Sequence, residues 1–229
     1  MIENVDPIIT VNRLRKGVGI LGISLPIVIV LLSLIPFFET DIQISLSAYY
    51  YTNLREIFTS VLSAVGFFLL LYKSDIADKN LNRRENILVN IMGVTAIGVA
   101  FIPTTCNVCN IGKIKCENAF SFIPHAGDTT AAFHAIIAAI LFLTFAYTSY
   151  FIFTKEDPNV KPGEVKIYKG SAIVIVFATI MILINGVFDF FAYTTLICEA
   201  LLLFGFGISW LVKGKPVSDK VTLFKGLYK

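Results

Sequence analysis

The sequence predicts an all-α membrane protein, a single domain over residues 1–229 in which six transmembrane helices form a bundle and both termini are cytoplasmic. Two observations predict it. Apolar residues make up 56% of the 229-residue chain and charged residues only 15%, whereas a typical soluble domain has about 25% charged residues. The apolar residues also stand in blocks of ~20, the length that a helix needs to cross a hydrocarbon layer of ~30 Å.

Six blocks meet this length. The predicted spans are 17–38, 54–72, 86–103, 129–153, 168–188 and 191–212. Each must be helical, because lipid offers no hydrogen-bond partner to backbone N–H and C=O groups. The first block is too long for the core of a signal peptide and no convincing cleavage site follows it, so we expect it to be retained.

The distribution of basic residues predicts the orientation. Sixteen of the nineteen Lys and Arg residues lie in the segments 1–16, 73–85, 154–169 and 213–229, which share one side of the predicted membrane. Loops rich in Lys and Arg stay in the cytoplasm. The net charge of +3 therefore reflects topology and does not indicate a nucleic-acid partner.

This topology predicts a multi-pass protein of a cell membrane, specifically a bacterial inner membrane, with membrane lipids as its partners. Whether the chain forms a homo-oligomer is left open. Tyr49, Tyr50 and Tyr51 precede the second span, and we expect their amphipathic rings at the outer membrane–water interface.

Ionisable side chains within apolar spans are costly and therefore candidates for function. The predicted ligand-binding residues, which all fall toward the outer side, are Arg55, Glu56, His134, Asn185, Asp189 and Glu199. Thr130 and His134 share one helix face, as do Thr195 and Glu199, because four residues make about one turn. We expect these faces to meet in a polar pocket that opens outward, with His134 and Glu199 as a titratable, hydrogen-bonded pair.

A metal site is a weaker alternative. His125, Asp128, His134 and Glu199, with Asp189, offer imidazole and carboxylate ligands of the kind that catalytic zinc sites use. No two histidines stand one turn apart on a helix, and no short metal motif is present. No cofactor is therefore predicted, with zinc kept as the alternative.

Three cysteines lie in the predicted outer loop 104–128. Cys106, Cys109 and Cys116 are disulfide candidates, because compartments outside the cytoplasm are oxidising. Three is an odd number, so one thiol is left over or pairs with Cys198, whose role the sequence does not define. Zinc binding or thiol exchange with a quinone are alternatives, but Cys106 follows the C-terminal end of a helix, where the helix dipole does not favour a thiolate.

Two stretches carry a family resemblance. Residues 45–73 (SLSAYYYTNLREIFTSVLSAVGFFLLLYK) and 198–215 (CEALLLFGFGISWLVKGK), together with Ala-Phe-Ile-Pro-Thr at 100–104 and the region of His134, resemble a family of bacterial six-helix integral membrane proteins of unknown function. The layout is also similar to the Frag1/DRAM/Sfk1 group, six-helix proteins linked to lipid handling. The resemblance places Tyr49 to Thr52, Arg55, Glu199, Ser209, Trp210 and Lys213 at family-like positions and implies no reaction. The cysteine-bearing loop is not part of the family pattern.

Three functions follow as hypotheses. The first is binding or transport of a lipid headgroup or small polar molecule in the outward pocket, with Arg55 meeting an anionic group. The second is a membrane-embedded lipid hydrolase, with or without zinc. The third is a thiol–disulfide or quinone oxidoreductase. A catalytic residue cannot be assigned from the sequence, which leaves enzyme activity undecided.

Overall fold

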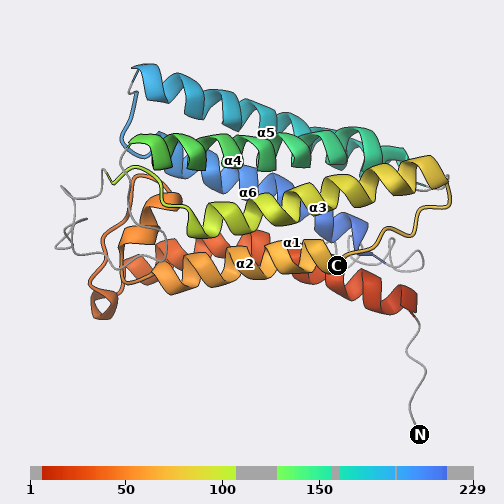
Figure 1. Cartoon of the computed structure of the whole chain (residues 1–229), viewed down its shortest axis with the longest axis horizontal. Coiled ribbons are helices and arrows are strands. Elements are labelled where there is room, and N and C mark those ends of the chain that lie inside the picture. Colours follow the sequence, from red (N-terminus) through yellow and green to blue (C-terminus); the bar gives the residue numbers. More distant parts are fainter. Residues whose placement is uncertain (1–6, 107–127, 156–159, 189, 216–229) are drawn as a thin grey trace, which may run out of the picture.

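A computed structural model describes residues 7–106, 128–155, 160–188 and 190–215, and all regular secondary structure in this part of the chain is helical. Figure 1 shows the long helices lying side by side, lengthwise along the molecule. In chain order the elements are α1 (Pro7–Ser33), η1 (Pro36–Phe38), η2 (Ser47–Tyr51), α2 (Arg55–Leu71), α3 (Lys79–Phe101), α4 (Asp128–Tyr147), η5 (Thr148–Ile152), η6 (Phe153–Lys155), α5 (Pro162–Phe188) and α6 (Thr194–Lys213).

The helix boundaries have local causes. Proline opens both α1 and α5, where its missing N–H costs no helical hydrogen bond. Asp78 caps α3 by accepting hydrogen bonds from the backbone N–H groups of Asn80 and Leu81, at 2.8 and 2.9 Å. These signals lie before the apolar blocks, so α1, α3 and α5 begin earlier than the predicted spans 17–38, 86–103 and 168–188.

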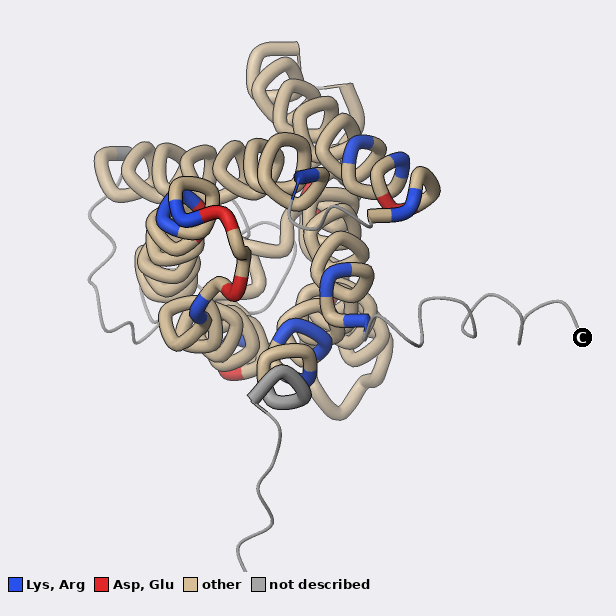
Figure 2. Tube along the Cα trace, turned by 90° about the vertical axis from the view of Figure 1, so that its right-hand side faces the viewer, with Lys and Arg blue, Asp and Glu red and all other residues tan. Residues whose placement is uncertain are grey.

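The long helices form a closed ring in chain order. α1 packs on α2, α2 on α3, and so on through α5 on α6, while α6 returns to α1. Figure 2 views this ring from one end. The first helix and the last therefore pack together, and the side chains of α6 face α1 on one side and α5 on the other.

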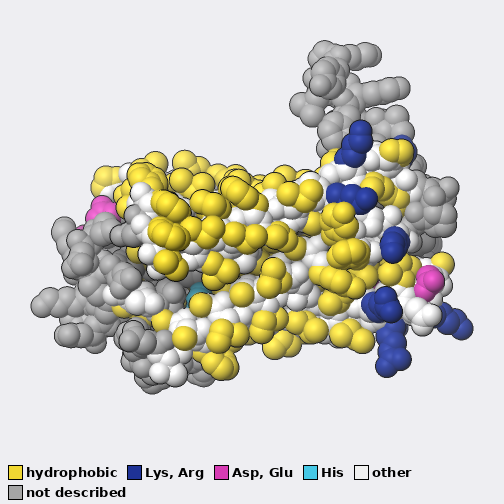
Figure 3. Space-filling view, turned by 90° about the horizontal axis from the view of Figure 1, so that it is seen from above, with side chains coloured by type: hydrophobic (Ala, Val, Ile, Leu, Met, Phe, Trp, Pro, Cys, Tyr) yellow, Lys and Arg dark blue, Asp and Glu magenta, His cyan; other side chains and the backbone are white. Residues whose placement is uncertain are grey.

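The two ends of the bundle differ in charge. The Lys213 end contains the start of α1, the α2–α3 connection and the end of α6, and Lys and Arg gather there (Figures 2 and 3). The Glu199 end contains η2, the end of α3 and the start of α6. Between them the surface is apolar (Figure 3), and apolar residues near the middle of the long helices are exposed, with Ile20 57%, Val94 62% and Phe177 58% exposed. Water-soluble surfaces rarely present such a continuous apolar area.

Five of the helices within the described residues are long and apolar enough to cross a membrane, by length and composition: those at Val11–Ser33, Lys79–Phe101, Thr129–Lys155, Pro162–Phe188 and Thr194–Lys213. These agree with five of the six predicted spans. α2 follows the predicted span 54–72 closely but has 17 residues, about 26 Å at 1.5 Å per residue. The expectation of a membrane-embedded helical bundle is therefore confirmed at the level of five helices.

Candidate functional site

The segment between α1 and α2 enters the bundle at its Glu199 end. All five residues of η2 are buried. The Tyr50 hydroxyl donates to the Phe101 carbonyl oxygen at 3.2 Å, and the Tyr51 hydroxyl donates to the Thr104 carbonyl oxygen at 2.7 Å. A helix ends with unpaired carbonyl groups, so these tyrosines satisfy the end of α3 and the residues after it.

The rings of Tyr49, Tyr50 and Tyr51, which were expected at the outer membrane–water interface, are packed inside the protein at the Glu199 end. Their relative exposures are 0%, 2% and 4%. Burial raises the pKa of Tyr51 to about 12, so its hydroxyl keeps its proton and remains a donor at physiological pH. The three rings fix η2 in place, and η2 in turn positions Ser47.

Ser47 joins the two most deeply placed ionisable groups of the prediction. Its hydroxyl lies 3.1 Å from Nε2 of His134 on α4 and 3.1 Å from Oε1 of Glu199 on α6. The second carboxylate oxygen, Oε2, accepts the backbone N–H of Leu46 at 2.5 Å. Nδ1 of His134 lies 2.6 Å from the carbonyl oxygen of Ile102. We call the chain His134–Ser47–Glu199 the relay.

The hydrogen bonds of the relay fix the histidine tautomer. A carbonyl oxygen only accepts, so Nδ1 of His134 carries a hydrogen, and in a neutral ring Nε2 is then an acceptor. An ionised Glu199 is also an acceptor. The Ser47 hydroxyl has one hydrogen and cannot donate to both neighbours.

One further proton on the relay would supply the second hydrogen bond. Placed on Nε2, it gives an imidazolium that donates to Ser47, which donates to the Glu199 carboxylate. Placed on Oε1, it gives a neutral carboxyl that donates to Ser47, which donates to His134. A concerted shift of two protons along the chain would convert one form into the other, so every hydrogen bond of the relay is satisfied when it holds one mobile proton.

A small cavity of about 30 Å³ adjoins the relay, lined by Ser47, Glu199 and apolar residues from α1, α2, α3, α4 and α6. This volume accommodates one or two water molecules. Glu199 is only partly buried, whereas His134 is 5% exposed. The carboxylate is therefore the member of the relay that water or a ligand can reach.

The other predicted binding residues do not join the relay. The guanidinium carbon of Arg55 lies 4.6 Å from the centre of the Tyr50 ring, a cation–π contact. Glu56 is exposed. The Asn185 side chain donates to Thr195 Oγ1 at 3.4 Å and accepts the backbone N–H of Phe190 at 3.1 Å, so it stabilises the α5–α6 connection.

The remaining candidates lie outside the described part of the chain. His125 and Asp189 fall there, and so does the side chain of Asp128. Within the described residues no group of three His, Cys, Asp or Glu side chains is arranged to hold a metal ion. Both ring nitrogens of His134 are engaged, so a zinc ion there would have to displace Ser47 or Ile102.

The cysteines separate into two environments. Cys106 is disulfide-bonded, and its partner lies outside the described residues, as do the other two candidates, Cys109 and Cys116. Cys198 is free and buried, so the alternative in which it pairs with a loop cysteine is wrong.

A second polar cluster, at the Lys213 end, was not predicted. Lys213 on α6 and Glu85 on α3 form an ion pair at 2.8 Å with both side chains 0% exposed. Tyr72 and Ser74 donate to the two oxygens of Glu85 at 3.0 and 2.5 Å. Arg15 donates to Tyr72 at 2.9 Å and pairs with Asp75.

The sequence offered one signal for this cluster. Glu85 is an acid beside two arginines at a predicted helix start, where it reads as a solvated charge. Arg15 and Lys213 were counted as cytoplasmic basic residues, and the family resemblance added nothing about a partner for Lys213. In the structure the contacts of Arg15 and Lys213 with Tyr72 and Glu85 connect α1, α3 and α6 to the end of α2.

Comparisons with known proteins found no match. No family model, no curated protein and no solved structure is similar to the chain. The resemblance to bacterial six-helix membrane proteins therefore stays a prediction, and functional conclusions rest on the geometry of the two clusters.

Proposed function

We propose that the chain is a six-span membrane protein that binds a lipid headgroup or a small polar molecule at the Glu199 end, together with one proton. The observation that carries this proposal is the relay, in which the Ser47 hydroxyl lies 3.1 Å from both a partly accessible carboxylate and a buried histidine. A ligand that donates a hydrogen bond to Glu199 in the adjoining cavity favours the carboxylate form, with the proton on His134.

Charge supports an orientation for this proposal. The Lys213 end holds basic residues at the start of α1, in the α2–α3 connection and at the end of α6, which supports a cytoplasmic location for that end. α2 is the sixth span, since 17 residues is the lower limit for a crossing helix. The relay then faces the outer leaflet of a bacterial inner membrane.

The contact between Arg55 and Tyr50 adds a second recognition element. Arg55 is partly exposed and begins α2, and its guanidinium packs on Tyr50 of η2, the short element that also carries Ser47. An anionic headgroup that meets the guanidinium at the outer surface would therefore sit above the relay. This arrangement favours a ligand with both an anionic group and a hydrogen-bond donor.

The test compares two acid-to-amide variants. Glu199→Gln keeps the shape of the side chain and an acceptor for Leu46 N–H, turns the contact with Ser47 into a donated hydrogen bond and removes the mobile proton. Glu56→Gln makes the same acid-to-amide change on an exposed residue at the same end. Native mass spectrometry of protein released from its own membrane should show a bound lipid or small molecule in the wild type. Loss of a hydrogen bond to a charged group costs about 1.5–3 kcal/mol, so occupancy should fall by about one to two orders of magnitude in Glu199→Gln.

Glu56→Gln should retain the bound molecule. An adduct of equal occupancy in the wild type and both variants would contradict a site at Glu199. Absence of any adduct in wild-type protein prepared without detergent would contradict the binding function itself.

One observation favours a second function, the lipid hydrolase. Ser47 Oγ lies 3.1 Å from His134 Nε2, and a carbonyl oxygen orients the opposite ring nitrogen, which is the arrangement of a nucleophile and its general base. If Ser47 is a nucleophile, a fluorophosphonate probe should label it covalently, and Ser47→Ala or His134→Ala should abolish labelling. An unlabelled wild-type chain would leave the binding function as the better supported.

A further inference from the structure

One face of α6 connects the two polar clusters. Glu199, Leu202, Phe206, Ser209 and Lys213 follow a spacing of three, four, three and four residues, so they lie on the same side of the helix. The last four are buried, at 1%, 2%, 2% and 4% exposure. Fourteen residues of helix rise about 21 Å, most of the thickness of a hydrocarbon layer. This face begins at a shared proton and ends at a buried ion pair.

A second small cavity lies along this face. It has a volume of about 10 Å³, is lined by Thr148, Ser149 and Ser209 and is otherwise surrounded by apolar and aromatic side chains. The hydroxyls of Ser149 and Ser209 lie 2.8 Å apart. Thr148 is 1% exposed, and its hydroxyl has no hydrogen-bond partner among the residues that the structure describes. A buried hydroxyl without a partner is costly, and the cavity is about large enough for one water molecule that would satisfy it.

The backbone is altered at the same place. Residues Thr148–Ile152 form a π-helical turn that follows α4 directly, and such turns are rare and occur at functional sites more often than elsewhere. The wider turn buries the two consecutive hydroxyl residues Thr148 and Ser149, at 1% and 2% exposure. Neighbouring residues of an α-helix lie about 100° apart about its axis, and the wider turn reduces this angle between Thr148 and Ser149.

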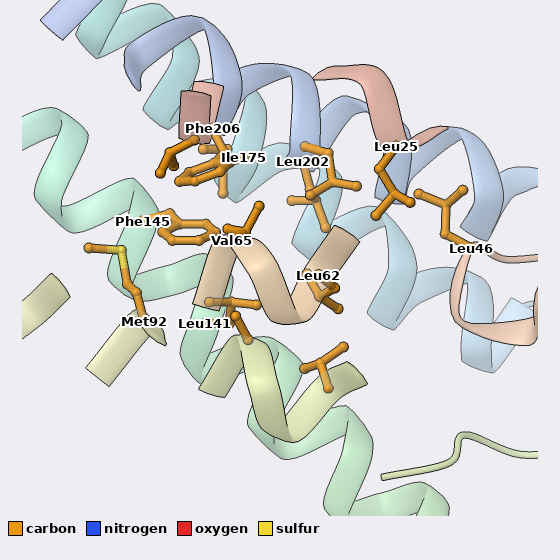
Figure 4. Close-up of a cluster of buried hydrophobic side chains, with 14 of the residues drawn as sticks. Leu25, Leu46, Leu62, Val65, Met92, Leu141, Phe145, Ile175, Leu202 and Phe206 are labelled. Carbon is orange, nitrogen blue, oxygen red and sulfur yellow. The ribbon is translucent and has the colours of Figure 1, made fainter. Parts of the chain in front are cut away.

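An apolar layer separates the two cavities. The rings of Phe145 and Phe206 stack with centroids 4.1 Å apart and planes 18° apart, and Leu141 and Leu202 lie beside them toward the relay (Figure 4). Leu141 lines the cavity at Glu199, and both phenylalanines line the cavity at Thr148. One stacked pair of rings with its flanking leucines is therefore the barrier between two polar spaces.

The second cavity leads toward the ion pair at the Lys213 end. Phe153 and Trp210 line it, with ring centroids 5.7 Å apart. The ammonium of Lys213 lies 4.3 Å from the centre of the Phe153 ring and 2.8 Å from Glu85. The order along the bundle is thus a proton-holding relay, an aromatic barrier, a hydroxyl-lined cavity, an aromatic pair and a buried carboxylate.

We propose that this face of α6 is a proton path, which the structure shows closed at the Phe145–Phe206 stack. When the rings separate, water joins the two cavities, and a proton leaves Glu199 and passes from one water or hydroxyl oxygen to the next toward Glu85. Each transfer forms one O–H bond and breaks another, and no oxidant or reductant takes part. The inference rests on the proposed function for the source of the proton and makes the ligand site one side of a proton-linked transporter.

The test is proton flux into liposomes of phosphatidylethanolamine and phosphatidylglycerol that contain the purified chain and a trapped pH-sensitive dye. A potassium gradient with valinomycin drives the flux. Phe206→Ala removes half of the stack and should raise the initial rate at least tenfold over the wild type. Ile208→Ala, a change of similar kind on the exposed face of α6, should leave the rate unchanged.

The decisive comparison adds a second substitution. Glu199→Gln in the Phe206→Ala background should return the rate to within twofold of the wild type, because the path has lost its proton donor. A rate in Phe206→Ala no higher than in Ile208→Ala would overturn the proposal, and so would a raised rate that persists with Glu199→Gln, which indicates a general leak. If Phe206→Ala does not fold, Phe145→Leu is measured against the same two criteria.

The flux experiment and the binding test can give different results, so the two proposals are tested separately. If the Glu199→Gln variant loses the bound molecule while neither phenylalanine variant shows proton flux, that result supports the ligand site and contradicts the proton path. A flux that depends on Glu199, in protein that carries no bound molecule, supports the path and contradicts the ligand site.

Discussion

Lys213→Met is expected to lower the free energy of unfolding by about 3–5 kcal/mol, the cost of leaving a buried charge without its partner. Both side chains of the Glu85–Lys213 pair are fully buried, so no water replaces the missing ammonium. Tyr72 and Ser74 continue to donate to the carboxylate, and Arg15 approaches it through Tyr72. Because these donors remain beside the Glu85 carboxylate, we expect a loss in the free energy of unfolding in the lower half of this range.

The matched rescue is the double variant Glu85→Gln/Lys213→Met. The amide keeps an acceptor for Tyr72 and adds a donor for Ser74, while no charge remains buried. Neutral replacements of buried ion pairs often cost little, so the double variant should recover to within about 1 kcal/mol of the wild type. The pair is then a device that fixes how α3 and α6 meet, since its net contribution to stability is small.

The chain supplies its own reporter for this measurement. Trp210 is its single tryptophan, lies three residues before Lys213 and packs edge-on against Tyr72 with ring centroids 5.2 Å apart. Its fluorescence can follow unfolding in mixed micelles with increasing dodecyl sulfate. Lys169→Met is the control, because Lys169 is exposed at the same end. Equal losses in Lys213→Met and Lys169→Met, or a double variant as unstable as the single one, would show that the pair does not act as described.

The sequence was most informative where a single physical constraint dominates. Long apolar blocks must become helices in lipid, so α2 and α6 begin and end close to the predicted limits, and α4 begins at the predicted place. The rest of the predicted span 129–153 continues as the π-helical and 3-10 turns η5 and η6. The shared depth of His134 and Glu199 could also be predicted, because helical rise converts position in a span into depth. Both results depend on distance along a helix, which sequence records directly.

The sequence was least informative where a loop or a helix end enters the core. Ser47, which joins His134 to Glu199, belongs to a segment with no helical or strand period, and only its insertion into the bundle brings it there. Lys213 illustrates a different difficulty. A lysine at a helix end can extend to water or pair inside the protein, and local sequence is the same in both cases. What decided the outcome was the position of Glu85, which is distant in sequence.

Gly207→Ala is expected to lower the free energy of unfolding by about 1–3 kcal/mol, the usual cost of adding volume where the structure cannot yield. A methyl group on Gly207 would lie 2.6 Å from the carbonyl oxygen of Gly19, and one on Gly19 would lie 2.8 Å from the carbonyl oxygen of Gly207. The obstructing atoms include backbone carbonyl oxygens, which cannot rotate away as a side chain can, so α1 and α6 must move apart. Small residues permit this kind of close approach between membrane helices.

Two comparisons make the glycine prediction specific. Gly170→Ala in α5 meets no atom within 4 Å, so it should leave stability unchanged or raise it by up to about 1 kcal/mol through helix propensity. In the double variant Gly19→Ala/Gly207→Ala the second methyl enters a space that the first has already opened. The double loss, measured by the same Trp210 fluorescence, should therefore fall short of the sum of the single losses. Strict additivity would mean that the two glycines do not share one contact, and the close packing of α1 against α6 would need another cause.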